Sequence, residues 1–226
     1  MLSSAAGSYR VREGLAYCVS NDRTIFLDIL ANRYFSLSPA LDEIFRRVIF
    51  EEPSEQVKPA ELARLVRANI VDSQDHQLFN HSSRAIEPPL RELRHIDTAT
   101  STILLANCVF AQARASIRLR RRSLAWLPQW VRERRRISSE RRSPETAWQV
   151  VTDAFAATVS IRPRSDRCLS SSIAFLDVGF SRDLDAQLVF GVYSCPFSAH
   201  CWVQAGDTVL NDRIENVRTF TPILAI

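Results

Sequence analysis

The chain has 226 residues, 46% of them hydrophobic, and a formal net charge of +4. This length allows one large domain or two small ones with a hydrophobic core of useful size. The five cysteines are scattered and include no CxxC pair, which argues against a disulfide scaffold and for a reducing compartment. We see no secretory signal and no run of about 18 apolar residues, so we expect a cytoplasmic protein without a membrane span.

The first 82 residues predict a compact module of three strands followed by helices. Three β-rich segments are expected to form strands: residues 15–19, 24–28 and 33–37. Ser38-Pro39 then provides a helix start, and Pro59 opens a second helix. This order indicates a winged-helix-like α+β module.

The rest of the chain predicts helices first and a small antiparallel sheet last. Residues 72–89 turn polar and irregular, so we place a domain boundary near residue 82. Residues 90–159 carry three apolar groups at helical density. Strands are expected at residues 188–193, 199–204 and 208–210. The expected fold is therefore α+β, with residues 1–82 and 83–226 as its two domains.

Arginine clusters between residues 114 and 142. A basic run can bind nucleic acid, as in a winged-helix regulator, but it also forms solvated helix faces. We favour the solvated face, because the run lies outside the winged-helix-like module and follows no recognition helix. We therefore expect no nucleic-acid partner.

Cys168 is the candidate nucleophile. Pro163, Ser165 and Asp166 suit a helix start, which would place Cys168 in the first turn of a helix. Unpaired N–H groups and the positive end of the helix dipole stabilise a thiolate there, and the thiolate is the competent nucleophile. The other cysteines are expected to be packing thiols: Cys18, Cys108, Cys195 and Cys201.

His200 and Asp212 are the candidate partners of this thiol, on two consecutive expected strands. A three-residue loop at residues 205–207 would place His200 directly opposite Asp212, within hydrogen-bonding reach. A two-residue loop would turn Asp212 to the opposite face, so the triad requires an odd loop or a bulge. Asn211 remains an alternative for orienting the imidazole.

In this triad His200 would deprotonate Cys168 and later protonate the leaving amine, while Asp212 holds the imidazole in place. The backbone N–H of Cys168 would stabilise the oxyanion. Trp202 alternates with His200 along the expected strand and could wall the site.

A zinc site is the competing chemistry for Cys195, His200 and Cys201. Adjacent strand residues point to opposite faces, so His200 and Cys201 cannot easily share one metal ion. The sequence also lacks a GxxxxGK[ST] loop for ATP. We therefore expect neither a metal nor another cofactor.

The C-terminal sequence resembles the lasso-peptide leader peptidases, a family of transglutaminase-like, papain-related cysteine proteases. The resemblance rests on four segments: Cys168-Leu169, Phe190-Gly191-Val192, the run from Pro196 to Gln204, and Asn211-Asp212. It implies a cysteine endopeptidase that removes the leader of a ribosomally made precursor. Cys201 departs from the family, which more often has a small residue such as alanine at this position.

The N-terminal segment resembles the leader-recognition element related to the pyrroloquinoline-quinone biosynthesis chaperone, on residues 24–28 and 32–38. In such modules the leader adds a strand beside the third strand. Of Tyr34 and Phe35, we expect one to face the core and the other to meet the peptide. The candidate substrate-binding residues are Ile25, Leu27, Tyr34, Phe35 and Trp202.

The resemblance also implies a partner, an ATP-dependent, asparagine-synthetase-like cyclase that closes the lasso ring. ATP would then belong to that partner. A threonine is implied next to last in the leader. Two alternatives stay open: acyl transfer to an amine by the same triad, as in transglutaminases, and a non-catalytic leader-binding adaptor.

Overall fold

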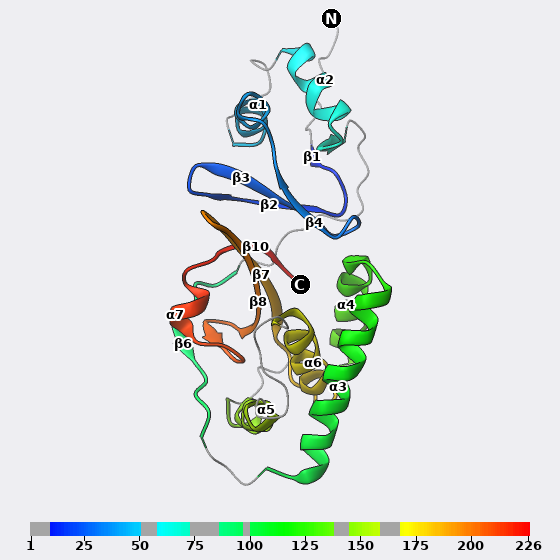
Figure 1. Ribbon diagram of the computed structural model, residues 1–226, viewed down its shortest axis with the longest axis vertical. Coiled ribbons are helices and arrows are strands. Elements are labelled where there is room, and N and C mark those ends of the chain that lie inside the picture. The colour runs from blue at the N-terminus through cyan, green and yellow to red at the C-terminus, as the bar shows by residue number, and fades with distance from the viewer. Residues whose placement is uncertain (1–9, 51–57, 73–85, 97–99, 138–144, 159–167) are drawn as a thin grey trace, which may run out of the picture. The chain divides into compact units, whose positions relative to one another are not determined.

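The computed structural model describes residues 10–50, 58–72, 86–96, 100–137, 145–158 and 168–226. The chain forms two compact units, one of residues 1–82 and one of residues 83–226. Figure 1 colours the first unit blue to cyan and the second green to red. Within the described ranges, no helix combines the length and the apolar character needed to cross a membrane.

The N-terminal unit contains an antiparallel sheet of three strands in chain order: β2 (Leu15–Ser20), β3 (Arg23–Asp28) and β4 (Arg33–Ser36). Asn21 and Asp22 both have positive φ, which is the backbone that a two-residue hairpin loop needs. Two further strands, β1 (Arg10–Val11) and β5 (Val71–Asp72), form a short antiparallel ladder that the sequence did not predict. The predicted order of three strands followed by helices is confirmed.

Two helices complete the core of this unit: α1 (Pro39–Phe50) and α2 (Pro59–Arg67). Phe26 of β3 is fully buried, with the ring of Phe45 edge-on at 4.9 Å and the ring of Phe35 stacked at 5.1 Å. The other buried residues of this cluster are Leu15, Ile44, Leu65, Ile70 and Val71. The apolar stripe of α1 therefore packs on one face of the sheet, as its helical spacing predicts.

An ion pair closes the open end of the N-terminal hairpin. The Asp28 carboxylate is buried and accepts a 2.6 Å hydrogen bond from Arg12, whose Nε also donates to the carbonyl of Asn69 at 2.7 Å. Burial would raise the pKa of Asp28, but the backbone N–H of Ala31 and the Arg12 guanidinium outweigh it and lower the pKa. Arg12 thus links β3 to the end of α2.

The C-terminal unit places its helices before most of its sheet, as expected. The helices are α3 (Thr102–Arg121), the 3₁₀ turn Leu124–Trp126 with α4 (Leu127–Ile137), α5 (Glu145–Thr158), α6 (Cys168–Phe180) and the short α7 (Ile214–Val217). The sheet order is β10 (Thr221–Ala225), β7 (Gln187–Ser194), β8 (Phe197–Ala205), β9 (Thr208–Val209) and β6 (Arg91–Glu92). All pairs are antiparallel except β6 with β9, and neither β6 nor β10 was predicted.

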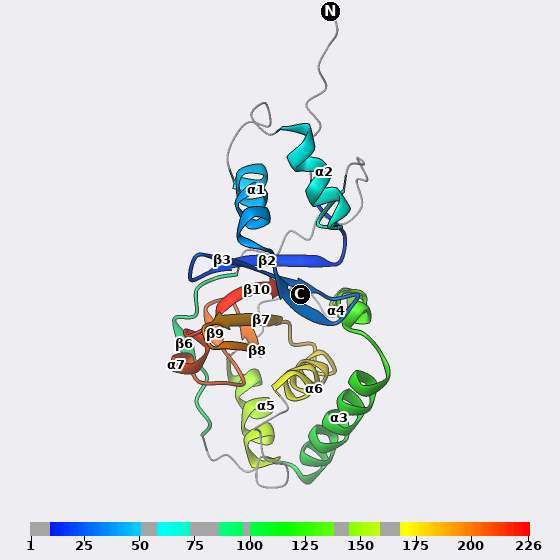
Figure 2. The same cartoon turned by 45° about the horizontal axis from the view of Figure 1, so that its top comes forward.

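Helix α6 is the central helix of this unit. It packs against α3, α5 and β8, and Figures 1 and 2 both show it between α3 and β8. Gly179 permits the contact with α5, because a Cβ at this position would lie 2.3 Å from the ring of Trp148. Trp148 also stacks on Phe175 at 5.5 Å between ring centroids. This packing fixes the C-terminal half of α6 against α5, while α6 also contacts the central strand β8.

The β8–β9 hairpin differs from the register that the sequence suggested. Ala205 pairs with Thr208 and Gln204 with Val209, so the loop holds only Gly206 and Asp207. Gly206 has a φ of +56°, which suits the first position of a type II′ turn and explains the tighter loop. The expected three-residue loop is therefore wrong.

Candidate active site

Cys168 is the first residue of α6 and is half-buried. Burial would raise the pKa of its thiol, but a hydrogen bond and the positive charge of His200 lower it. The backbone N–H groups of Leu169 and Cys201 also donate to the sulfur and lower the pKa further. The net pKa lies below that of an ordinary thiol, so these contacts favour the thiolate.

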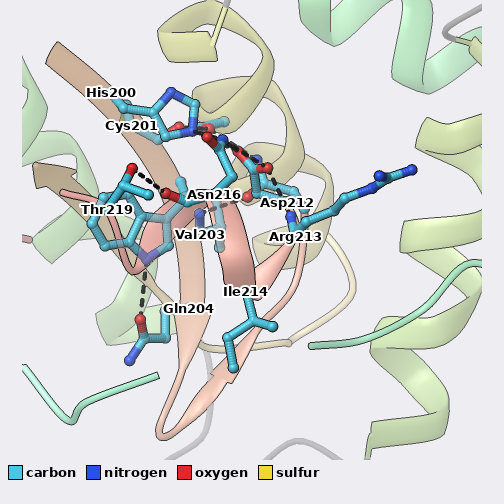
Figure 3. Close-up of polar contacts among 12 residues, drawn as sticks. His200, Cys201, Val203, Gln204, Asp212, Arg213, Ile214, Asn216 and Thr219 are labelled. Atoms are coloured by element: carbon cyan, nitrogen blue, oxygen red, sulfur yellow. Dashed lines mark hydrogen bonds and ion pairs between the residues drawn. The ribbon is translucent and has the colours of Figure 1, made fainter. Parts of the chain in front are cut away.

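His200 lies in the middle of β8, with its imidazole between the thiol and a carboxylate. Nε2 of the ring is 2.5 Å from Oδ2 of Asp212 (Figure 3), which leaves Nδ1 as the ring nitrogen for Cys168. Burial alone would lower the pKa of His200, but the hydrogen bonds to Asp212 and Cys168 and their negative charges raise it to about 9. Thiolate and imidazolium therefore stabilise each other.

Asp212 follows β9, and its two carboxylate oxygens have different partners. Oδ2 faces His200, and Oδ1 accepts a 2.7 Å hydrogen bond from the backbone N–H of Arg213. Burial would raise the pKa of Asp212, but these contacts and a bond from Asn216 lower it. Asp212 is therefore held as a carboxylate.

Asn216 was missed by the sequence analysis. Its Nδ2 lies 3.2 and 3.3 Å from the two oxygens of Asp212 and 3.3 Å from Nε2 of His200. Figure 3 shows its side chain beside both. The spacing of four residues from Asp212, in a segment that forms the helical turn α7, is the signal that could have identified it.

Asn211 turns away from the imidazole. Its Oδ1 accepts from the backbone N–H of Val203 at 2.7 Å, and its Nδ2 donates to the hydroxyl of Ser172 at 2.9 Å. The structure therefore places Asp212, and not Asn211, against His200.

Two aromatic rings support the imidazole. The ring of Phe220 lies 5.0 Å from that of His200, and the ring of Trp202 stacks at 6.2 Å. Trp202 is fully buried and donates from Nε1 to Gln204, so its ring presents no surface to a substrate in this arrangement. Gly191 is required opposite His200, because a Cβ there would lie 2.7 Å from Trp202 and 2.9 Å from Phe220.

A cavity of about 520 Å³ adjoins the triad. Asp212 lines it, as does Ser171, which lies three residues after Cys168 in α6. Leu93, Phe155 and Phe175 contribute apolar walls. Asp212 is the triad residue in its lining, and charged side chains share the wall: Glu92, Arg94, Arg213 and Glu215.

The candidate leader-binding residues of the N-terminal unit lie on both faces of its sheet. Phe35 packs on Phe26 in the core, so Tyr34 is the residue of this pair on the opposite face. Ile25 and Leu27 share that face by alternation, and both side chains are buried. Their contact with a peptide stays a prediction.

One comparison with known proteins falls within the C-terminal unit. A family model described as the transglutaminase-like superfamily matches residues 111–225, the region that contains Cys168, His200 and Asp212. The microcin J25-processing protein McjB of Escherichia coli is 41% identical over 58 residues, which are 26% of this chain and 27% of McjB. The chain thus spans only about a quarter of the length of this relative. No solved structure matches the chain significantly.

Proposed function

Because this chain belongs to the transglutaminase-like superfamily, whose model matches about half of its length, we propose that it is a cysteine endopeptidase. Its substrate would be a ribosomally made lasso precursor, from which it removes the leader. The observation that carries this proposal is the chain of contacts from the Cys168 sulfur through His200 to Asp212. The similarity to a microcin-processing protein supports the choice of substrate class.

The proposed reaction begins with attack of the Cys168 thiolate on the carbonyl carbon at the end of the leader. The backbone N–H of Cys168 stabilises the oxyanion. The His200 imidazolium gives its proton to the leaving amine of the core peptide, which breaks the C–N bond and leaves a thioester. His200 then takes a proton from water, and the hydroxide attacks the thioester carbon. The C–S bond breaks, which restores the Cys168 thiolate beside the His200 imidazolium, and the leader leaves as a carboxylic acid.

Recognition of the leader is assigned to the N-terminal unit. In the described part of this unit, β4 is an edge strand that pairs with β3 alone, and an edge strand can accept an added peptide strand. The Arg33 guanidinium lies over the ring of Phe35 at 5.2 Å, which places a positive charge at this strand. Ring closure would belong to the asparagine-synthetase-like cyclase, which would also use the ATP.

The test is cleavage of a synthetic leader–core precursor by the full chain, followed by mass spectrometry. Cys168→Ala should fold normally and lose cleavage below detection. Cys195→Ala removes an exposed cysteine outside the site and is the matched control. Cleavage retained by Cys168→Ala would overturn the proposal.

Two additional measurements separate the alternatives. An added primary amine that becomes covalently attached to the leader, in place of the free acid, would indicate acyl transfer by the same triad. Leader binding without any cleavage, in the presence or absence of the cyclase and ATP, would indicate an adaptor. Fluorescence anisotropy of labelled leader with residues 1–82 tests whether this unit carries the binding.

A further inference from the structure

A second set of hydrogen bonds lies directly behind the triad. The Ser172 hydroxyl is 1% exposed and donates to the backbone carbonyl of Cys201 at 3.0 Å. It accepts a hydrogen bond from Asn211 Nδ2 at 2.9 Å. Asn211 Oδ1 in turn accepts from the backbone N–H of Val203 at 2.7 Å.

Each member of this set is close in the chain to one member of the triad. Ser172 lies four residues after Cys168, about one turn along α6. Cys201 follows His200 in β8, and Asn211 precedes Asp212. Three elements that are separate in sequence each supply one triad residue and at least one residue of this network.

We infer that Ser172 and Asn211 are positioning residues that hold α6, β8 and the segment after β9 in the spacing the triad requires. This inference rests on the proposed function of the triad. The two side chains bond to the Cys201 carbonyl, to the Val203 N–H and to each other, so both act through the backbone they fix.

The burial of the network makes its hydrogen bonds hard to replace. Loss of the Ser172 hydroxyl leaves the Cys201 carbonyl and the Asn211 amide without this partner in a region that excludes most water. The backbone of Cys201 also donates its N–H to the Cys168 sulfur. A shift of this backbone therefore moves the thiolate's donor and His200 together.

The first experiment compares the variants Ser172→Ala and Asn211→Ala in cleavage of the precursor. Each should lower kcat by about ten- to a hundredfold, the range expected when reacting groups shift by a fraction of an ångström to 1 Å. KM should stay within about twofold for Ser172→Ala, because this hydroxyl is buried and does not line the cavity beside Asp212, whereas Asn211 does. The double variant should lose hardly more than either single variant, because the two side chains share one hydrogen bond.

Thr158→Val is the matched control. The Thr158 hydroxyl is also buried, donates to a backbone carbonyl at 2.7 Å and accepts from the side-chain amide of Gln112 at 2.9 Å. It joins α3 to α5, and neither helix carries a triad residue. Loss of the Thr158 hydroxyl should lower the melting temperature about as much as loss of the Ser172 hydroxyl, but kcat should stay within about twofold of the wild-type value.

A second experiment needs no peptide and therefore separates this inference from the proposed function. The rate of Cys168 alkylation by iodoacetamide is measured against pH in the folded wild type and variants. Ser172→Ala and Asn211→Ala should shift the profile to higher pH, and Thr158→Val should not. If folded Ser172→Ala and Asn211→Ala alkylate with the wild-type profile, the inference is overturned, whether or not the chain cleaves a precursor.

Discussion

Replacement of Asp212 by asparagine tests the proposed chemistry through one change of charge. The imidazole of His200 is buried, and burial alone lowers its pKa. The pKa nevertheless rises from about 6.5 to about 9, and the hydrogen bond to Asp212 is the largest of the contributions that raise it. One pKa unit corresponds to about 1.4 kcal/mol, so the charged partners exceed the burial penalty by about 3 kcal/mol.

The variant should reverse this balance. The introduced amide can still accept from the Arg213 N–H, but it then turns its NH₂ group toward Nε2 of His200. Nε2 must accept, so a neutral imidazole carries its proton on Nδ1 and cannot take the proton of Cys168. We expect kcat to fall by a factor on the order of 10³–10⁴, as in triads that lose this charge.

The assay is cleavage of the leader–core precursor, with the His200 titration followed by NMR. Asp207→Asn is the control, because Asp207 lies on the same hairpin but pairs with Arg91 at an exposed position. It should retain activity within about twofold. A folded Asp212→Asn variant that keeps kcat within tenfold, or a His200 pKa that stays near 9, would refute the reasoning.

Three more predictions follow from the same contacts. In a plot of kcat/KM against pH, the alkaline limb should lie near pH 9, where the His200 imidazolium loses its proton. The raised pKa of His200 also adds to the free energy of unfolding. This contribution is fully present below about pH 6.5 and is lost as the pH rises through about 9. Gly191→Ala should force Trp202 to move and lower both kcat and the free energy of unfolding, the latter by about 1–3 kcal/mol in urea titrations. Arg12→Ala should leave the buried Asp28 with only the more distant and exposed Arg33 as a cation, at 3.9 Å, cost up to about 3–5 kcal/mol in the N-terminal unit and weaken leader binding measured by anisotropy, with unchanged alkylation of Cys168 as the control.

Local sequence patterns were sufficient to predict the elements that carry Cys168 and His200. The strands at residues 15–20, 23–28 and 33–36 are β-rich and are separated by turn residues, so they could be predicted. The strand that carries His200 is β-rich throughout, and α6 begins at Cys168 itself. In each case the deciding signal lies within a few residues of the element.

The strands that were missed depend on partners far away in the sequence. β6 is only two residues long and becomes a strand by parallel pairing with β9, more than a hundred residues later. β10 contains Pro222, which argues against a strand, but β10 is an edge strand with an irregularity at this point. Ser172 was missed for the same reason, since no local pattern shows that its hydroxyl meets Cys201 and Asn211.

The contact between His200 and Asp212 forms although the hairpin loop has two residues, because strand pairing stops before Asp212. The ladder ends with Val209 opposite Gln204, and one further backbone bond joins the Leu210 N–H to the Val203 carbonyl. The next partner of Val203 is the Asn211 side chain instead of a backbone carbonyl. Once a side chain takes the place of the backbone, the alternation of faces no longer applies to the residues that follow. Asp212 is therefore free to turn back to the imidazole. The requirement for a loop of odd length assumed that the second strand of the hairpin continues as far as Asp212, and it does not.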